Sequence, residues 1–122
     1  MIQLTFEANK ESILKAHIIK VNDNFNPVSF NDVYRAINKL MKTVLFPEIE
    51  NWLLDLLRDE KLYVINGLLA ALYFDLNCFK EAKEFAYIAR QDFPDTEIWD
   101  NIIIRSAQAE AVEEIIPEDI FK

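Results

Sequence analysis

The chain has one histidine and one cysteine, two residue types commonly used for metal binding and nucleophilic catalysis. His17 lies on an apolar stripe with Leu14 and Ile18. No cysteine, aspartate or second histidine stands beside it at the spacing of metal ligands. Cys78 lies in a predicted turn and has no evident catalytic companion. We therefore expect a partly buried, hydrogen-bonded His17, a Cys78 without a catalytic role, and no metal site.

Acidic side chains also occur in pairs, at Asp59 with Glu60 and at Asp92 with Asp95. Paired carboxylates can divide general acid and base roles between them. Both pairs, however, lie beside predicted helix ends, where acidic residues are favoured for capping and for the helix dipole. The single glycine leaves no glycine-rich loop for phosphate. The sequence therefore predicts a protein that is not an enzyme, has no catalytic residues and needs no cofactor.

The composition favours one helical domain over residues 1–122. Hydrophobic residues make up 52% of the 122 residues, and there are one glycine and four prolines, so long helices are favoured over tight turns and flexible linkers. No stretch approaches the roughly 20 apolar residues that span a bilayer. The first residues lack the layout of a signal peptide. We expect a cytoplasmic protein with no membrane partner and no disulfide.

The net charge of −8 is unevenly placed. Residues 1–43 have six Lys and Arg against four Asp and Glu, a net of +2, and residues 44–122 have seven against seventeen, a net of −10. An acidic chain is a poor match for nucleic acid, because phosphate binding needs clustered cations. The one basic patch contains Arg35, Lys39 and Lys42. It suits either an acidic partner or the acidic half of the same chain.

Apolar residues recur every three or four positions through most of the chain, which predicts an all-α bundle or short solenoid of five to six helices. Ser29 is the predicted N-cap of one helix, and Pro117 is the predicted end of the last. Residues 1–8 alternate in polarity and fit either a short strand or the start of a helix. The other predicted segments are a helix over 10–21, a helical hairpin over 29–60, a second hairpin over 63–96, a capping helix over 97–115 and a tail over 116–122.

Segment 63–96 has the most specific spacing in the chain. Small and large residues recur across two helical patterns, at Leu69, Ala70, Tyr73, Ala82, Ala89 and Pro94, with Asn77 at the turn between them. This spacing resembles the tetratricopeptide repeat, a helix-turn-helix unit of about 34 residues. Asn66 and Ala86 stand where that repeat usually has larger residues. An ordinary antiparallel helix pair would use the same small residues for close packing, so it remains an alternative.

The resemblance implies a binding groove, because the first helix of each tetratricopeptide repeat lines a concave surface. Carried onto this chain, the residues expected to bind a partner are Val64, Gly67, Leu68, Ala71, Phe74 and Asp75. All but Asp75 are apolar or small, which suits an amphipathic helix or an apolar segment of another protein. The expected function is a protein-binding adaptor or chaperone. Small acidic repeat proteins of this kind are similar to type III secretion chaperones.

The sequence also fits two other functions. The apolar faces, including the isoleucine-rich final helix, suit a structural homodimer buried against a second copy. The acidic surface instead suits an immunity or inhibitor protein that covers a basic partner. A third possibility is that the helices predicted at 29–43 and 47–60 fill the groove from within the same chain.

Overall fold

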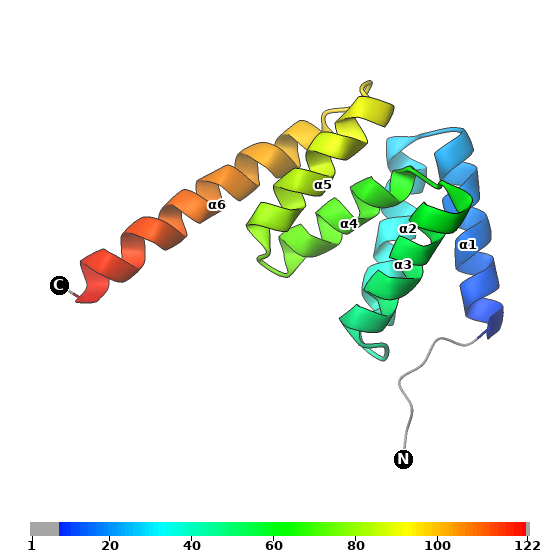
Figure 1. Ribbon diagram of the computed structural model, residues 1–122, viewed down its shortest axis with the longest axis horizontal. Helices are drawn as coiled ribbons and strands as arrows, with labels where there is room; N and C mark the ends of the chain where they lie inside the picture. Colours follow the sequence, from blue (N-terminus) through cyan, green and yellow to red (C-terminus); the bar gives the residue numbers. More distant parts are fainter. Residues whose placement is uncertain (1–7, 122) are drawn as a thin grey trace, which may run out of the picture.

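The computed structural model describes residues 8–121, and the side chains of residues 8–112. Within that range it has no strand and six helices: α1 (Ala8–Asp23), α2 (Pro27–Leu40), α3 (Phe46–Glu60), α4 (Val64–Asp75), α5 (Phe79–Asp92) and α6 (Ile98–Phe121). Figure 1 shows α1, α2 and α3 grouped at one end, with α5 and α6 running toward the other. The predicted all-α fold is confirmed. Residues 1–8 are predicted as a strand or a helix start; Ala8 is the first residue of α1, and residues 1–7 lie outside the described range.

The core is built around α4. Its residues Val64, Ile65, Leu68, Leu69 and Leu72 are each at most 1% exposed. Every other helix packs against α4. A helix that is apolar on all sides must be covered on all sides, because exposed apolar area is unfavourable in water. The composition of α4 therefore places it at the centre of the bundle.

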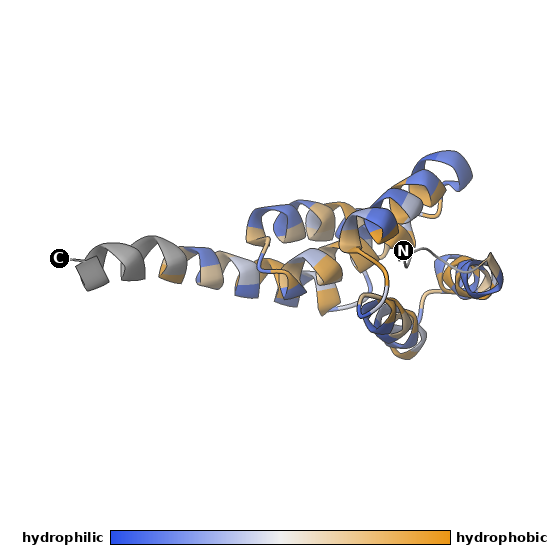
Figure 2. Ribbon diagram, turned by 90° about the horizontal axis from the view of Figure 1, so that it is seen from below, coloured by the Kyte–Doolittle hydropathy of each residue, from blue (hydrophilic) through white to orange (hydrophobic). Residues whose placement is uncertain are grey.

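The helices around α4 have one apolar and one polar side, as the hydropathy colours of Figure 2 show. In α1 the buried stripe consists of Leu14, Ile18 and Val21. Ile13 is 59% exposed, and His17 is also exposed. The prediction that His17 is partly buried is therefore wrong. The apolar stripe of α1 is narrower than the periodicity indicates, because α1 packs against α2 and α4 along one edge only.

An antiparallel hairpin joins α4 and α5. The close approach occurs at small residues, because Ala82, Ala86 and Ala89 of α5 are fully buried. Asn77 has φ 61°, in the left-handed region that the sequence predicts for it. The backbone N–H of Cys78 donates to the carbonyl of Tyr73, and that of Asn77 donates to the carbonyl of Phe74. These two bonds form a Schellman motif that ends α4 and reverses the chain.

Short polar side chains cap the starts of α2, α4 and α6. The N-cap of α2 is Asn26 rather than the predicted Ser29, because Asn26 Oδ1 accepts the N–H groups of Val28 and Ser29 and Pro27 can open the helix without an N–H. Thr96 Oγ1 accepts the N–H of Ile98 at the start of α6. The first turn of α4 is capped from another helix, since Asn22 Oδ1 of α1 accepts the N–H of Val64 at 2.9 Å.

One predicted boundary and one predicted packing arrangement are described differently by the structure. The last helix continues through Pro117 to Phe121 and does not end at 115, so the predicted tail over 116–122 is helical as far as Phe121. A proline removes one helical hydrogen bond, and here that loss does not stop the helix. Segment 29–60 contains α2 and α3, and their backbones approach α4 more closely than they approach each other.

A row of aromatic rings links the outer helices across α4. The ring of Tyr73 lies 5.6 Å from that of Phe46 in α3 and stacks at 5.5 Å on that of Phe85 in α5. Burial raises the pKa of Tyr73, and so does the hydrogen bond that its hydroxyl donates to Glu50.

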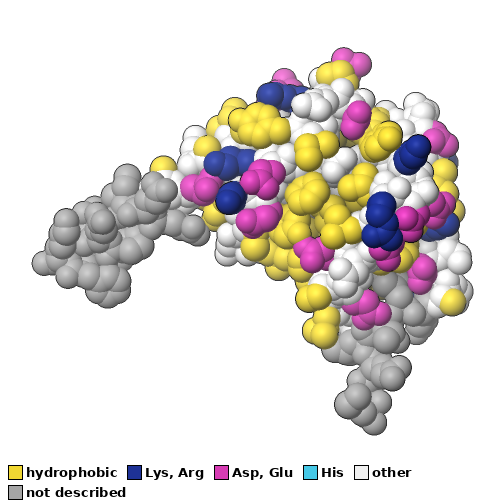
Figure 3. Space-filling model, viewed as in Figure 1, with side chains coloured by type: hydrophobic (Ala, Val, Ile, Leu, Met, Phe, Trp, Pro, Cys, Tyr) yellow, Lys and Arg dark blue, Asp and Glu magenta, His cyan; other side chains and the backbone are white. Residues whose placement is uncertain are grey.

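Figure 3 shows apolar side chains on the face seen in Figure 1, bordered by acidic and basic ones.

Candidate binding groove

The six residues predicted to bind a partner divide into two groups along α4. The N-terminal three, Val64, Gly67 and Leu68, are buried. The C-terminal three, Ala71, Phe74 and Asp75, line an open groove. Of the six residues expected to bind a partner, the first three are therefore covered by other helices of the same chain, and the last three remain at a groove.

Trp99 of α6 covers Gly67. The indole is fully buried and packs against Phe30 at 5.2 Å and Phe25 at 5.8 Å. Its Nε1–H donates to the carbonyl of Phe93 at 2.9 Å, so the ring is held at a fixed position. A Cβ on residue 67 would lie 2.6 Å from Cζ3 of this ring and closer still to Cη2. The only glycine of the chain therefore stands where the indole leaves no space for a side chain.

The groove lies between α2, α4 and α6 and has a volume of about 530 Å³. This volume is within the range of about 300–1,000 Å³ that small-molecule pockets occupy. Its lining combines apolar and aromatic side chains with polar ones. The lining residues are Pro27, Phe30, Asn31 and Tyr34 of α2, Ala71, Phe74 and Asp75 of α4, and Ile98, Asn101, Ile102 and Arg105 of α6.

Two charged side chains of opposite sign, Asp75 and Arg105, line this groove. Burial raises the pKa of the Asp75 carboxyl. Asn38 Nδ2 lies 3.4 Å from Asp75 Oδ2, a long hydrogen bond that leaves the carboxylate available to a stronger donor. The groove therefore offers a bound ligand apolar surface to cover, and one charge of each sign to fix the orientation of that ligand.

Most of the groove comes from helices other than α4. The sequence pattern shows Phe30, Ile98 and Ile102 as members of apolar stripes, which does not distinguish a groove wall from a core position. The sequence signal that could have pointed to α6 is the expected resemblance of segment 63–96 to a tetratricopeptide repeat, because the helix after such a repeat is expected to open a following one.

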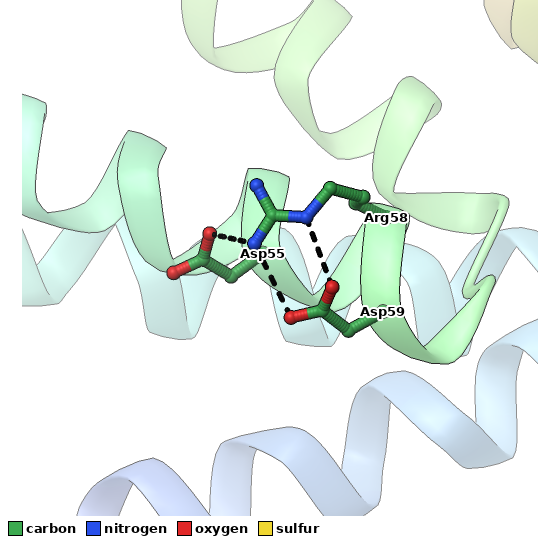
Figure 4. Close-up of polar contacts among 3 residues, drawn as sticks. All are labelled: Asp55, Arg58 and Asp59. Carbon is green, nitrogen blue, oxygen red and sulfur yellow. Dashed lines mark hydrogen bonds and ion pairs between the residues drawn. The ribbon is translucent and has the colours of Figure 1, made fainter.

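The side chains suited to chemistry are dispersed. Asp59 and Asp55 are held by Arg58, whose guanidinium lies 2.9 Å from a carboxylate oxygen of each (Figure 4). The hydrogen bond from Arg58 lowers the pKa of Asp59. Glu60 pairs with Lys15 of α1 at 2.6 Å. The Asp59–Glu60 pair thus contributes to surface ion pairs, which explains these carboxylates without a reaction.

Within the described residues, no three His, Cys, Asp or Glu side chains gather as a metal site would require. Cys78 is half-buried, and its thiol donates to the carbonyl of Leu76 at 3.7 Å. In the part of the chain that the structure describes, no helix has the length and apolar character to cross a membrane. Comparison with protein-family models, with curated proteins and with solved structures finds no match to this chain.

Proposed function

We propose that this chain is a non-enzymatic protein-binding module, an adaptor or chaperone that holds an apolar or amphipathic helical segment of another protein. The observation that carries the proposal is the groove between α2, α4 and α6. Three of the six residues predicted for partner binding, Ala71, Phe74 and Asp75, line it.

The groove lining has the composition of a protein interface. Tyr34 and Phe74 are partly exposed and provide aromatic area, and aromatic residues are enriched where proteins bind one another. A helix that binds in a groove inserts apolar side chains spaced three or four residues apart. Beside them, the partner would place a cation or an amide near Asp75 and a carboxylate near Arg105. We therefore expect an amphipathic partner with charges of both signs rather than a strongly basic or acidic one.

The arrangement of the helices supports the tetratricopeptide-like interpretation of segment 63–96. In such repeats the first helix of each pair lines the concave surface. Here the groove is lined by α2, α4 and α6, which are the alternate helices of the chain, while α3 and α5 contribute no residue to it. Other helices of the chain cover Val64, Gly67 and Leu68, while Ala71, Phe74 and Asp75 stay at the groove, where α2 forms one wall.

The test is selection of binding peptides from a displayed library of helical sequences, followed by measurement of their affinity for variants. We expect Phe74→Glu to weaken binding by about tenfold or more, because a charge would replace an apolar contact at the centre of the groove. Tyr87→Glu is the matched control, since Tyr87 is 46% exposed on α5 and outside the groove.

Phe74 also packs against Phe79 at 5.6 Å, so Phe74→Glu must be checked for its helical circular dichroism signal. Asp75→Lys provides a second variant, because Asp75 is exposed and its replacement removes no apolar contact. Selected peptides that bind both groove variants as tightly as the wild type would place the binding site on another surface and refute the proposal.

A further inference from the structure

A second groove runs along the boundary of α1 and α2 and shares no residue with the first. Its volume is about 580 Å³. Three lysines, one histidine and no carboxylate are among its lining residues, which are Lys10, Ile13, Leu14, His17, Ala36, Lys39, Leu40, Lys42 and Thr43. A neighbouring hollow of about 310 Å³ continues it, shares Leu14, His17 and Ala36, and adds one lysine, Lys20, and one carboxylate, Asp32. The result is an apolar floor whose border has four lysines against one carboxylate.

The shape of this groove suits a helix. On α1, the residues that line the two hollows extend from Lys10 to Val21 at three- and four-residue spacing. Eleven steps of a helix at about 1.5 Å each give a groove of about 16 Å, or three turns. A bound helix could therefore place apolar residues against Leu14 and Leu40 over its whole contact.

The groove presents apolar area and positive charge to solvent together. Ile13 is 59% exposed at its edge. Among the described residues, neither Lys39 nor Lys42 forms an ion pair within the chain. A complementary occupant has acidic residues flanking an apolar stripe.

The C-terminal end of α6 has that composition. Residues 113–121 contain Glu113, Glu114, Glu118 and Asp119 together with Ile115, Ile116, Ile120 and Phe121, and no lysine or arginine. Ion pairs join Lys83 to Glu110 and Arg90 to Asp100, which sets α5 and α6 antiparallel. In this register Phe79, the first residue of α5, lies beside about residue 114, so α6 runs on past the start of α5 (Figure 1).

This end of α6 lies far from the α1–α2 groove of its own chain, at the opposite end of the molecule in Figure 1. We propose that the groove binds residues 113–121 of a second copy, and that two copies exchange these segments reciprocally in a closed dimer. The acidic half of one chain then meets the basic groove of the other, and the apolar floor of that groove is covered. This surface is separate from the groove between α2, α4 and α6, so either proposal can fail without the other.

The test is the mass of the full chain by light scattering or sedimentation over a range of concentrations and salt. We expect a dimer that weakens as salt rises, because exposed charges are screened. Ile13→Glu should raise the dimer dissociation constant by about tenfold or more, because it replaces an apolar contact with a charge. Ile104→Glu is the matched control: Ile104 is 54% exposed on α6, outside the groove, and the dimer should be unchanged.

Charge reversal tests the electrostatic half of the proposal. Lys39→Glu with Lys42→Glu should dissociate the dimer, and adding Glu113→Lys with Glu114→Lys to the same chain should restore it. The control pair is Lys61→Glu with Lys80→Glu, which makes the same change in net charge at exposed sites outside the groove. Restoration of the dimer requires the groove lysines to meet residues 113–114 of the other copy. A general loss of solubility or fold would not be reversed by Glu113→Lys with Glu114→Lys.

A synthetic peptide of residues 109–122 identifies the occupant directly. We expect the labelled peptide to bind the wild-type chain, to compete with dimer formation, and to lose affinity by about tenfold for Ile13→Glu. A wild-type chain that stays monomeric at all concentrations would overturn the proposal. So would a dimer that persists in Ile13→Glu and in the lysine variants, because another face would then hold it together.

Discussion

The close contact between Gly67 and Trp99 makes Gly67→Ala an unusual substitution. In the interior of a helix, replacing glycine by alanine normally stabilises by about 0.5–1 kcal/mol, because alanine loses less backbone entropy on folding. In α4 the added methyl would lie 2.6 Å from Cζ3 of Trp99, well inside van der Waals contact. The ring has little freedom to retreat, since it is fully buried and its Nε1–H is bonded to the carbonyl of Phe93.

The gain in helix propensity and the clash with Trp99 have opposite signs. Their magnitudes decide whether Gly67→Ala raises or lowers the free energy of unfolding. Inserting a methyl group into a packed core costs about 1–3 kcal/mol. Because Trp99 also packs against Phe30 and Phe25, we take the upper half of that range. Subtracting the gain from helix propensity leaves a net destabilisation of about 1–2 kcal/mol for Gly67→Ala. The assay is urea unfolding followed by circular dichroism, with the free energy taken from the midpoint and the slope.

A double-mutant cycle with Trp99→Phe isolates the contact. Phenylalanine lacks the outer ring that carries Cζ3 and Cη2, so Gly67→Ala in that background should stabilise by up to about 1 kcal/mol. A change of sign between the two backgrounds is the expected result. If Gly67→Ala stabilises the wild-type chain, or has the same effect in both backgrounds, the indole does not determine the need for glycine at this position.

Three further predictions concern polar groups. Asn22→Ala should lower the free energy of unfolding by about 1 kcal/mol in chemical denaturation, because it removes the acceptor for the N–H of Val64, while Asn22→Asp should retain most of the stability. Ser106 is fully buried, and its hydroxyl has no partner among the described residues. Ser106→Ala should therefore raise the thermal midpoint, and a lower midpoint would indicate a bound water or an unseen partner. Because the pKa of Tyr73 is raised in the folded state, the unfolded chain ionises first as pH rises above about 10. The stability that Tyr73 contributes is complete below that pH and is lost above it, so the unfolding free energy of the wild type should fall more steeply than that of Tyr73→Phe. If the unfolding free energies of the wild type and Tyr73→Phe fall equally with pH, the raised pKa of Tyr73 is contradicted.

Local rules predicted most of the helices correctly. The left-handed Asn77 and the buried alanines of α5 follow from turn chemistry and from spacing, which depend on neighbouring residues alone. The start of α2 was predicted at Ser29, but Asn26 directly before Pro27 is the stronger capping signal. The end of α6 was missed because Pro117 weakens a helix without always ending it.

The candidate site was predicted only in part, for a physical reason. The sequence places Val64, Leu68 and Phe74 on one helix as similar apolar residues, and it contains no information on which of them a distant helix will cover. The reach of Trp99 over Gly67 depends on the angle at which α6 crosses α4. The cap that Asn22 places on Val64 depends on the position of α1. Periodicity therefore identifies the residues that must be covered, while the packing of six helices decides which remain accessible.

Helix α2 forms a wall of both grooves and explains why they are independent. Pro27, Phe30, Asn31 and Tyr34 line the groove shared with α4 and α6, whereas Ala36, Lys39 and Leu40 line the groove shared with α1. Between these faces, Val33 and Ile37 are buried in the core and hold the helix in place. A substitution on one face therefore leaves the side chains of the other in position. Partner binding and self-association can thus be tested separately in the same full-length chain, and loss of one with retention of the other would show that the two surfaces are distinct.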